Sequence, residues 1–96
     1  MKEKIIQALK NVIDPELGFN VYDLGLIYQV ETQQNHCKIT MTLSTKSCPL
    51  HDLIISWVKE AALSVPDCKE CEINLVWEPM WDIQMASDDI KKSLGF

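Results

Sequence analysis

The sequence predicts an α+β fold, a two-layer sandwich with helices packed on one face of a three- to four-stranded, mostly antiparallel sheet. Segments with apolar residues at helical spacing open, interrupt and close the chain, and segments that alternate apolar and polar residues lie between them. The expected order is helix, two strands, helix, one or two strands, helix. The 96 residues suffice for one domain and are too few for two, so we expect a single domain over residues 1–96.

The first helix is expected over Lys2 to Val12, where apolar residues recur at helical spacing between polar ones. It should stop before Asp14-Pro15, because the residue preceding a proline avoids the helical region. Residues 14–18 then form a turn that leaves through Gly18, and a connector over Asn20 to Gly25 ends in a second turn.

Two strands of a hairpin are expected next, over Leu26 to Thr32 and His36 to Ser44. In the second strand the apolar face comprises Cys37, Ile39, Met41 and Leu43, and the polar face comprises Lys38, Thr40 and Thr42. The alternation predicts a strand that is buried on one side.

The second helix should open at Cys48-Pro49, because proline fits the first helical position, and end near Ser64 ahead of Pro66. An apolar stripe facing the sheet is expected from Leu50, Leu53, Ile54, Trp57, Val58 and Ala61.

A third strand is predicted over Cys71 to Trp77, and the alternation of Trp81, Ile83 and Met85 favours a short fourth strand after Pro79. Ser87 is placed to cap a last helix that ends before Gly95.

The net charge is −5 and the sequence has no run of basic residues, so few positive side chains could bind phosphate groups. This argues against nucleic acids and anionic membranes as partners. The first residues lack the pattern of a secretory signal, and no apolar stretch is long enough for a membrane span. We therefore expect a cytoplasmic protein whose four cysteines are thiols, core residues or metal ligands.

Cys48 is the candidate functional thiol, because it occupies the predicted N-cap of the second helix. Unpaired N–H groups and the positive dipole end of a helix stabilise a thiolate there, and a thiolate binds metal or attacks an electrophile. His51 follows in the first turn of this helix, and its imidazole could lie close to the Cys48 sulfur. The alternative is that Cys48 only caps the helix and that His51 faces solvent.

Four polar residues are candidates for a pocket around this thiol: Asp14, Glu16, Asp23 and Thr42. The acidic residues lie in connectors, where functional side chains gather, and Thr42 lies near the end of the second strand. Turn formation is an alternative explanation for the aspartates, as is ordinary strand preference for the threonine.

The remaining cysteines are expected to be incidental. Cys68 and Cys71 form a C-x-x-C pair that enters a strand and has no second pair, so a metal site there is not favoured. Cys71 should point to the core and Cys68 to solvent, and Cys37 should be a small core residue. Among the aromatic residues, Trp77 should pack on the core, whereas Met80 and Trp81 could form a partner-binding ridge.

Several motifs together resemble the SufT-like, PaaD-like family of iron–sulfur assembly proteins. They occur in the family's order and are residues 14–18, 21–28, 41–43, 48–49 and 77–81. The resemblance implies a compact α+β domain that acts in iron–sulfur protein maturation, with the family's reactive cysteine at Cys48. It places the acidic turn residues at Asp14, Glu16 and Asp23, and the threonine at Thr42.

The expected partners are iron–sulfur assembly proteins and client apo-proteins, and the expected role is non-catalytic. No permanent cofactor is expected; because a cluster generally takes four ligands, Cys48 would hold iron or a cluster only transiently, with ligands from a homodimer, a partner or small thiols. The alternatives are an adaptor that docks the assembly machinery to clients, an accessory subunit of a ring-oxygenase pathway, and a thiol enzyme with Cys48 as nucleophile and His51 as base.

Overall fold

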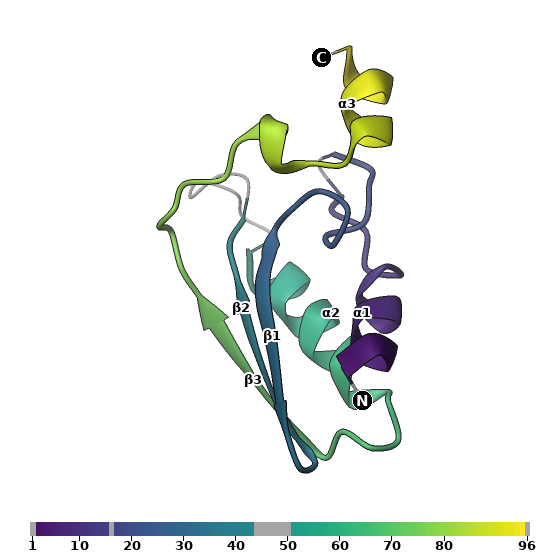
Figure 1. The fold of residues 1–96 in the computed structure, drawn as a ribbon, viewed down its shortest axis with the longest axis vertical. Coiled ribbons are helices and arrows are strands. Elements are labelled where there is room, and N and C mark those ends of the chain that lie inside the picture. Colours follow the sequence, from purple (N-terminus) through teal and green to yellow (C-terminus); the bar gives the residue numbers. More distant parts are fainter. Residues whose placement is uncertain (1, 16, 44–50, 96) are drawn as a thin grey trace.

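The computed structural model describes residues 2–15, 17–43 and 51–95. The elements in chain order are α1 (Lys2–Leu9), β1 (Ile27–Gln33), β2 (His36–Met41), α2 (His51–Leu63), β3 (Glu70–Leu75), the 3-10 helix η1 (Ile83–Met85) and α3 (Asp88–Leu94). The α+β class predicted from the sequence is confirmed (Figure 1).

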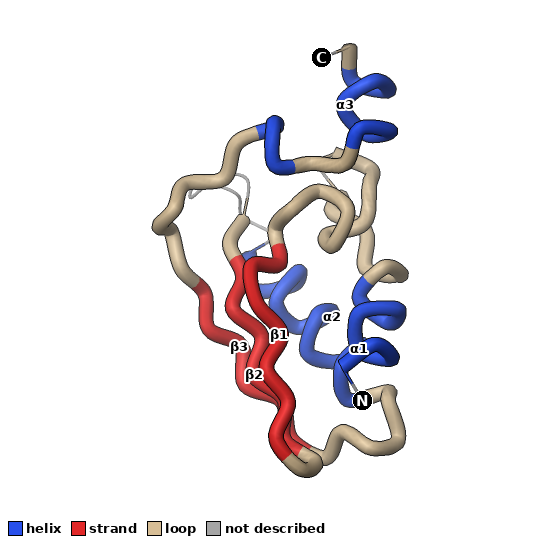
Figure 2. The backbone as a smooth tube through the Cα atoms, in the orientation of Figure 1, coloured by secondary structure: helices blue, strands red, loops and turns tan. Residues whose placement is uncertain are grey.

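The sheet is mixed, with the strand order β1-β2-β3 (Figure 2). β1 and β2 form the expected antiparallel hairpin, in which Val30 lies opposite Ile39. β3 pairs with β2 in parallel, and Ile39 lies opposite Ile73. The prediction of a mostly antiparallel sheet is therefore wrong for β3, because α2 returns the chain along the sheet and delivers β3 in the direction of β2.

Helices α1 and α2 pack on one face of the sheet, as predicted, whereas α3 lies beyond the end of the sheet (Figure 1). The apolar face of β2 lies fully in the core, with Cys37, Ile39 and Met41 buried. The stripe predicted for α2 is confirmed at Ile54 and Val58, which are buried. It is wrong at Leu53, which is exposed because it projects from α2 away from the sheet.

Helix α1 ends at Leu9, three residues before the predicted end at Val12. The N–H groups of Asn11 and Val12 donate to carbonyls only three residues back, which tightens the chain into turns. The Val12 carbonyl then accepts a hydrogen bond from Val21 N–H and so is committed to the neighbouring segment.

The fourth strand predicted over residues 81–85 does not form, and η1 occupies this segment instead. The Asp82 side chain accepts a 2.9 Å hydrogen bond from Gln84 N–H and caps η1. A local side-chain bond of this kind competes with strand pairing, so the alternation of apolar residues here does not produce a strand.

Strand β2 ends at Met41, and the predicted end at Ser44 lies outside the described residues. Strand β3 runs one residue earlier at its start and two residues shorter at its end than predicted. Single backbone bonds continue the pairing past both strands: Thr42 N–H donates to Leu26 O at 2.9 Å and Val76 N–H to Met41 O at 2.8 Å.

Helix α3 starts and stops at the predicted residues. Ser87 is its N-cap, although its side chain makes no capping hydrogen bond. Gly95 adopts the left-handed conformation at φ 87° and donates its N–H to the carbonyls of Lys91 and Lys92. This is the helix termination that glycine favours.

The predicted burial of Cys37 and Cys71 is confirmed, but the predicted exposure of Cys68 is wrong, because only 3% of it is exposed. Cys68 precedes β3 and therefore does not follow the alternation of that strand. Its N–H donates to Val65 O at 2.9 Å, and its thiol donates to Glu70 O at 3.3 Å, so the side chain is turned toward the start of β3.

Across the described ranges, no helix combines the length and the apolar character that crossing a membrane requires.

Candidate functional site

Asp14 lies buried in the turn that follows α1, with 2% of its surface exposed. Its N–H donates to Phe19 O at 2.9 Å, and its carbonyl accepts from Gly18 N–H at 2.8 Å. One carboxylate oxygen accepts from Leu17 N–H at 3.3 Å. The sequence Asp-Pro thus forms a turn in which the aspartate side chain holds the backbone, as such residues do in turns.

Thr42 directly follows β2 and is 1% exposed, so the side chain expected near the end of this strand is buried. The residue comes after the last paired residue of the strand, and its N–H donates a hydrogen bond to Leu26 O. Its hydroxyl oxygen has no hydrogen-bond partner within the part of the chain that the structure describes. A buried hydroxyl without a partner costs about 1–3 kcal/mol, which makes this side chain a marker of a constrained position.

A series of backbone hydrogen bonds connects Thr42 to the Asp14 turn. Thr42 N–H donates to Leu26 O, Leu26 N–H donates to Val21 O, and Val21 N–H donates to Val12 O, at distances of 2.9, 3.1 and 2.9 Å. These backbone bonds therefore lead from Thr42 to Val12, two residues before Asp14 in the sequence. This network holds the end of β2 against the turn after α1.

Asp23 lies on the connector between these segments. Its carboxylate accepts from the Asn20 side-chain amide at 2.8 Å, and its N–H donates to the Asn20 side-chain oxygen at 2.8 Å. Its carbonyl accepts from Ser87 N–H at 2.8 Å. Asp23 therefore stabilises its own turn and joins it to the N-cap of α3.

Three residues of the predicted site fall outside what the structure describes. Cys48 and Glu16 lie outside the described residues, and the side chain of His51, the first residue of α2, lies outside them as well. The part of the predicted pocket that is described consists of Asp14, Asp23 and Thr42.

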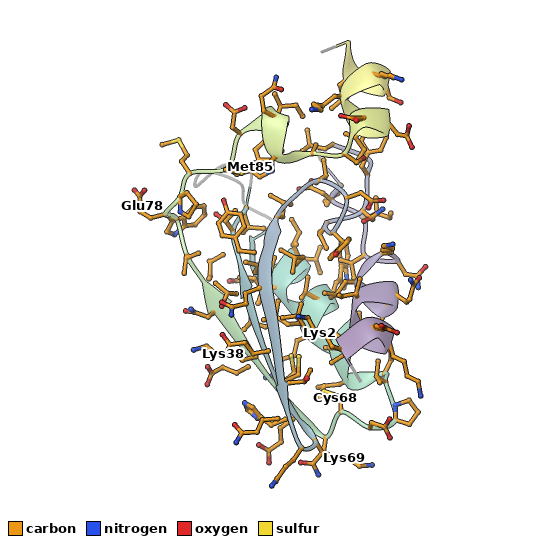
Figure 3. The ribbon with its side chains drawn as sticks, in the orientation of Figure 1. Lys2, Lys38, Cys68, Lys69, Glu78 and Met85 are labelled. Carbon is orange, nitrogen blue, oxygen red and sulfur yellow. The ribbon has the colours of Figure 1, made fainter. Side chains whose placement is uncertain are left out.

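The predicted partner ridge is held by contacts to two distant segments. The Trp81 indole N–H donates to Leu24 O at 2.7 Å, and the Tyr28 hydroxyl donates to Pro79 O at 2.7 Å. Met80, between these two anchored positions, is 76% exposed. Figure 3 shows Glu78 and Met85, from the same part of the chain, in the half of the molecule opposite that of Cys68. The anchored segment thus presents the exposed thioether of Met80.

The sequence analysis did not identify a groove of about 600 Å³ between the end of α1 and helix α2. It is lined by Asn11, Val12, Ile13, Pro15, Trp57, Glu60 and Ala61. In this groove Ile13 is 47% exposed, because α1 ends before it, and Trp57 of α2 is partly buried against the core. Pro15, directly after Asp14, was the sequence signal that the helix ends early and leaves this groove open, since a proline limits the helix before it.

In the described residues, no three side chains of His, Cys, Asp or Glu are placed to hold a metal ion. The thiols of Cys37 and Cys71 are protonated at neutral pH, since burial raises the pKa of Cys37 to about 12 and also raises the pKa of Cys71. These two buried thiols are therefore poor nucleophiles and poor ligands in the folded protein.

Comparison with known proteins gives a consistent result. Residues 2–75 match the model of a family described as "Iron-sulfur cluster assembly protein". The chain is 41% identical over 96 residues to the "Fe-S protein maturation auxiliary factor YitW" of Bacillus subtilis, covering 99% of this chain and 94% of that protein. It is 40% identical over 85 residues to the "Fe-S protein maturation auxiliary factor SufT" of Staphylococcus aureus, covering 88% of this chain and 97% of that one.

Among solved structures, the chain is similar to a domain of unknown function, DUF59, from Bacillus anthracis. The two share 39% sequence identity and superpose with a TM-score of 0.92, and the match covers 99% of this chain and 92% of the other. The fold described above is therefore one already seen in a related sequence.

Proposed function

Because this chain belongs to the iron–sulfur cluster assembly protein family, we propose that it is an auxiliary factor in iron–sulfur protein maturation and acts through the Cys48 thiol. The observation that carries the proposal is the family match over residues 2–75, together with identities of about 40% to two maturation auxiliary factors. The proposed role is non-catalytic. The cluster or its iron is cargo that the protein engages transiently.

The residues around the described part of the pocket support this role. Asp14 and Thr42 both have buried polar side chains, and backbone hydrogen bonds lead from Thr42 to Val12, next to the Asp14 turn. Asp14 lies beside Glu16 in the sequence, and Thr42 precedes the segment that contains Cys48. In the proposal, Asp14, Glu16, Asp23 and Thr42 shape the approach to the thiol, and His51 supplies a nearby imidazole.

Cys48 contributes one thiolate, whereas a cluster takes about four protein ligands. We therefore propose that the other ligands come from an assembly protein, a client apo-protein or a second copy of the chain. The proposed partners are therefore iron–sulfur assembly proteins and client apo-proteins. An acidic chain with a net charge of −5 favours partners with complementary basic surfaces.

A maturation assay tests the role of the thiol. Cells that lack this protein would be supplied with wild type, Cys48→Ser or Cys71→Ser, and the activity of a cluster-containing client enzyme would be measured. Cys71→Ser is the matched control, because it also removes one thiol, from a buried position in β3. We expect Cys48→Ser to lose client activity and Cys71→Ser to retain it. Full client activity with Cys48→Ser would refute the proposed thiol role.

A second candidate function is an adaptor that docks assembly proteins to clients without engaging the cluster. The exposure of Met80 beside the anchored Trp81 favours it, since exposed Met and Trp side chains are enriched at interfaces. In that case Met80→Ala and Trp81→Ala would lose the partner in a pull-down, whereas Cys48→Ser would retain it and remain active.

Anaerobic reconstitution with iron and sulfide separates the two functions directly. Absorbance and native mass are measured for wild type and Cys48→Ser. Iron-dependent absorbance that needs Cys48 supports the thiol role, and a doubled native mass identifies a second copy as the source of ligands. Identical spectra without bound iron for both proteins favour the adaptor.

A further inference from the structure

Strand β3 forms one edge of the sheet. The strand order is β1-β2-β3, so β2 pairs with one side of β3, and no segment of the described ranges pairs with its other side (Figure 2). All six residues of β3 pair with β2 without a shift in register, and none of them is a proline. The strand therefore presents a regular backbone edge over Glu70–Leu75, which is what the addition of a further strand requires.

The other edge strand, β1, is less suited to pairing. Its register with β2 shifts between Ile27 and Gln29, so the strand is irregular there. Tyr28, in the same stretch, is anchored through its hydroxyl, which donates to Pro79 O at 2.7 Å. An irregularity of this kind twists an edge away from the geometry that a further strand needs. Of the two edges, β3 is therefore the one open to strand addition.

The backbone groups that face the free edge belong to alternate residues of β3. Val76, directly after the strand, donates its N–H to Met41 O of β2 at 2.8 Å. Backbone groups alternate in direction along a strand, so the even-numbered residues of β3 bond to β2 and the odd-numbered residues face outward. The outward N–H and C=O groups are those of Cys71, Ile73 and Leu75. A further strand would form its hydrogen bonds with these groups.

The side of this edge that faces the helices is apolar and partly open. Helix α2 packs against both α1 and β3, and its Trp57 lines the groove on the α1 side. Residues two positions apart lie on nearly opposite sides of a helix, so Ile55 is on the flank of α2 toward β3. Ile55, Ile73 and Leu75 are each partly exposed. Apolar side chains at alternate positions of an added strand would cover them.

The solvent side of the same edge is acidic. Glu70 and Glu72 are exposed, and His36 and Lys38 of β2 approach them to 3.5 and 3.9 Å. These two side chains come from the β2 side, so the carboxylates remain accessible from the free edge. A cation directly opposite a glutamate on a neighbouring strand is favourable, whereas a second glutamate is unfavourable. The edge therefore favours a basic strand over a second copy of this chain, which would bring its own β3 carboxylates and a net charge of −5.

We propose that the free edge of β3 binds an extended segment of a partner protein as a fourth strand of the sheet. The segment carries lysine or arginine at alternate positions, opposite Glu70 and Glu72. Apolar residues lie between these positions and cover Ile55 and Ile73. The proposal is independent of the thiol role, because none of these contacts involves Cys48.

The probe is a short blocked peptide in which lysine and valine alternate, and the control peptide has glutamate in place of each lysine. Both are titrated into the isotope-labelled full chain, with a reductant present, while backbone amide signals are followed by nuclear magnetic resonance. We expect the lysine peptide to shift the amide signals of Cys71, Ile73 and Leu75 most and to slow their hydrogen exchange. The signals of β1 should stay in place. The glutamate peptide should bind about fivefold more weakly or not at all.

Two pairs of variants separate strand addition from general attraction to an acidic protein. Glu72→Lys should weaken binding of the lysine peptide about fivefold. Glu31→Lys is its matched control, because Glu31 of β1 lies on the other side of the same Lys38, and it should leave the affinity nearly unchanged. Ile73→Pro removes one outward N–H and should abolish binding, whereas Ile73→Val keeps this group and should bind the peptide.

Three results would overturn the proposal. The first is the absence of shifts at the outward amides of β3 while circular dichroism shows a folded protein. The second is equal weakening by Glu72→Lys and Glu31→Lys, which would mean general charge attraction only. The third is a doubled native mass of the protein alone that Ile73→Pro returns to the monomer value, since a second copy would then occupy the edge. If Ile73→Pro does not fold, the two charge variants decide between strand addition and general attraction.

Discussion

The indole N–H of Trp81 donates a 2.7 Å hydrogen bond to the backbone carbonyl of Leu24, which joins the segment after β3 to the turn before β1. Leu24 is fully buried, and Trp81 packs against the same core. The two residues are 57 positions apart in the sequence, so this bond holds the segment after β3 against the turn before β1. It also sets the position from which Met80 projects.

Trp81→Phe should lower the free energy of unfolding by about 1 kcal/mol, in addition to the effect of the smaller ring. The Leu24 carbonyl loses its hydrogen-bond donor, whereas most of the aromatic packing is kept. Urea unfolding monitored by circular dichroism measures the change. Trp57→Phe is the control, since Trp57 is also half-buried and the structure gives its indole no hydrogen bond among the described residues. Equal losses for the two variants would show that the bond to Leu24 contributes nothing.

Gly25→Ala should destabilise the protein by about 2–4 kcal/mol. Gly25 has φ +81°, and a Cβ there would meet the backbone carbonyl group of Met85, whose carbon would lie 2.9 Å away. Both the left-handed conformation and the clash with backbone therefore oppose a side chain.

Gly18→Ala provides the matched control for this effect. Gly18 has nearly the same φ, +78°, but a Cβ there has nothing within 4 Å. Gly18→Ala should therefore lower the free energy of unfolding by only about 1 kcal/mol, the energy needed to hold an alanine in the left-handed conformation. If urea midpoints fall equally for the two variants, the close approach of Met85 is unimportant.

The sequence predicted the features that depend on local pattern. The alternation in residues 37–41 correctly placed Cys37, Ile39 and Met41 in the core, because neighbouring residues of a strand point to opposite faces. Gly95 correctly marked the end of α3, because glycine readily adopts the left-handed conformation that ends a helix.

The features that failed depend on contacts between distant segments. The parallel direction of β3 follows from where α2 delivers the chain, which no local pattern records. Thr42 is buried just after the end of β2 and Cys68 just before the start of β3, so neither position follows from the alternation within a strand. The backbone network that joins Thr42 to the Asp14 turn likewise passes through Leu26 and is invisible in the sequence.

Thr42→Val should leave the free energy of unfolding unchanged or raise it by about 1 kcal/mol, because valine has the same shape and the buried hydroxyl has no partner among the described residues. If the hydroxyl serves the proposed site, the same variant should lower client maturation. Urea unfolding and the client assay together separate these effects. Thr40→Val, on the solvent side of β2, is the control and should change neither quantity appreciably. A destabilised Thr42→Val protein would mean that the hydroxyl is bonded after all.

Stability should fall at alkaline pH because of the buried thiols. Burial raises the pKa of Cys37 from the ordinary 9.0 to about 12, with the neighbouring Cys71 and Cys68 adding to the increase. Below pH 9 the thiol is protonated in both the folded and unfolded states, so its contribution is constant. Between about pH 9 and pH 12 the unfolded state loses the proton while the folded state keeps it, and the stability falls by up to about 1.4 kcal/mol per pH unit.

Urea unfolding in the presence of a reductant, repeated at several pH values, measures this decline. Cys37→Ala removes the thiol that titrates, so its stability should decline less steeply above pH 9 than that of the wild type, although it starts lower because a core atom is lost. Cys71 has its own raised pKa and keeps a smaller slope in the variant. Parallel curves for the two proteins from pH 8 to pH 11 would mean that the Cys37 thiol ionises as readily in the folded protein as in the unfolded chain.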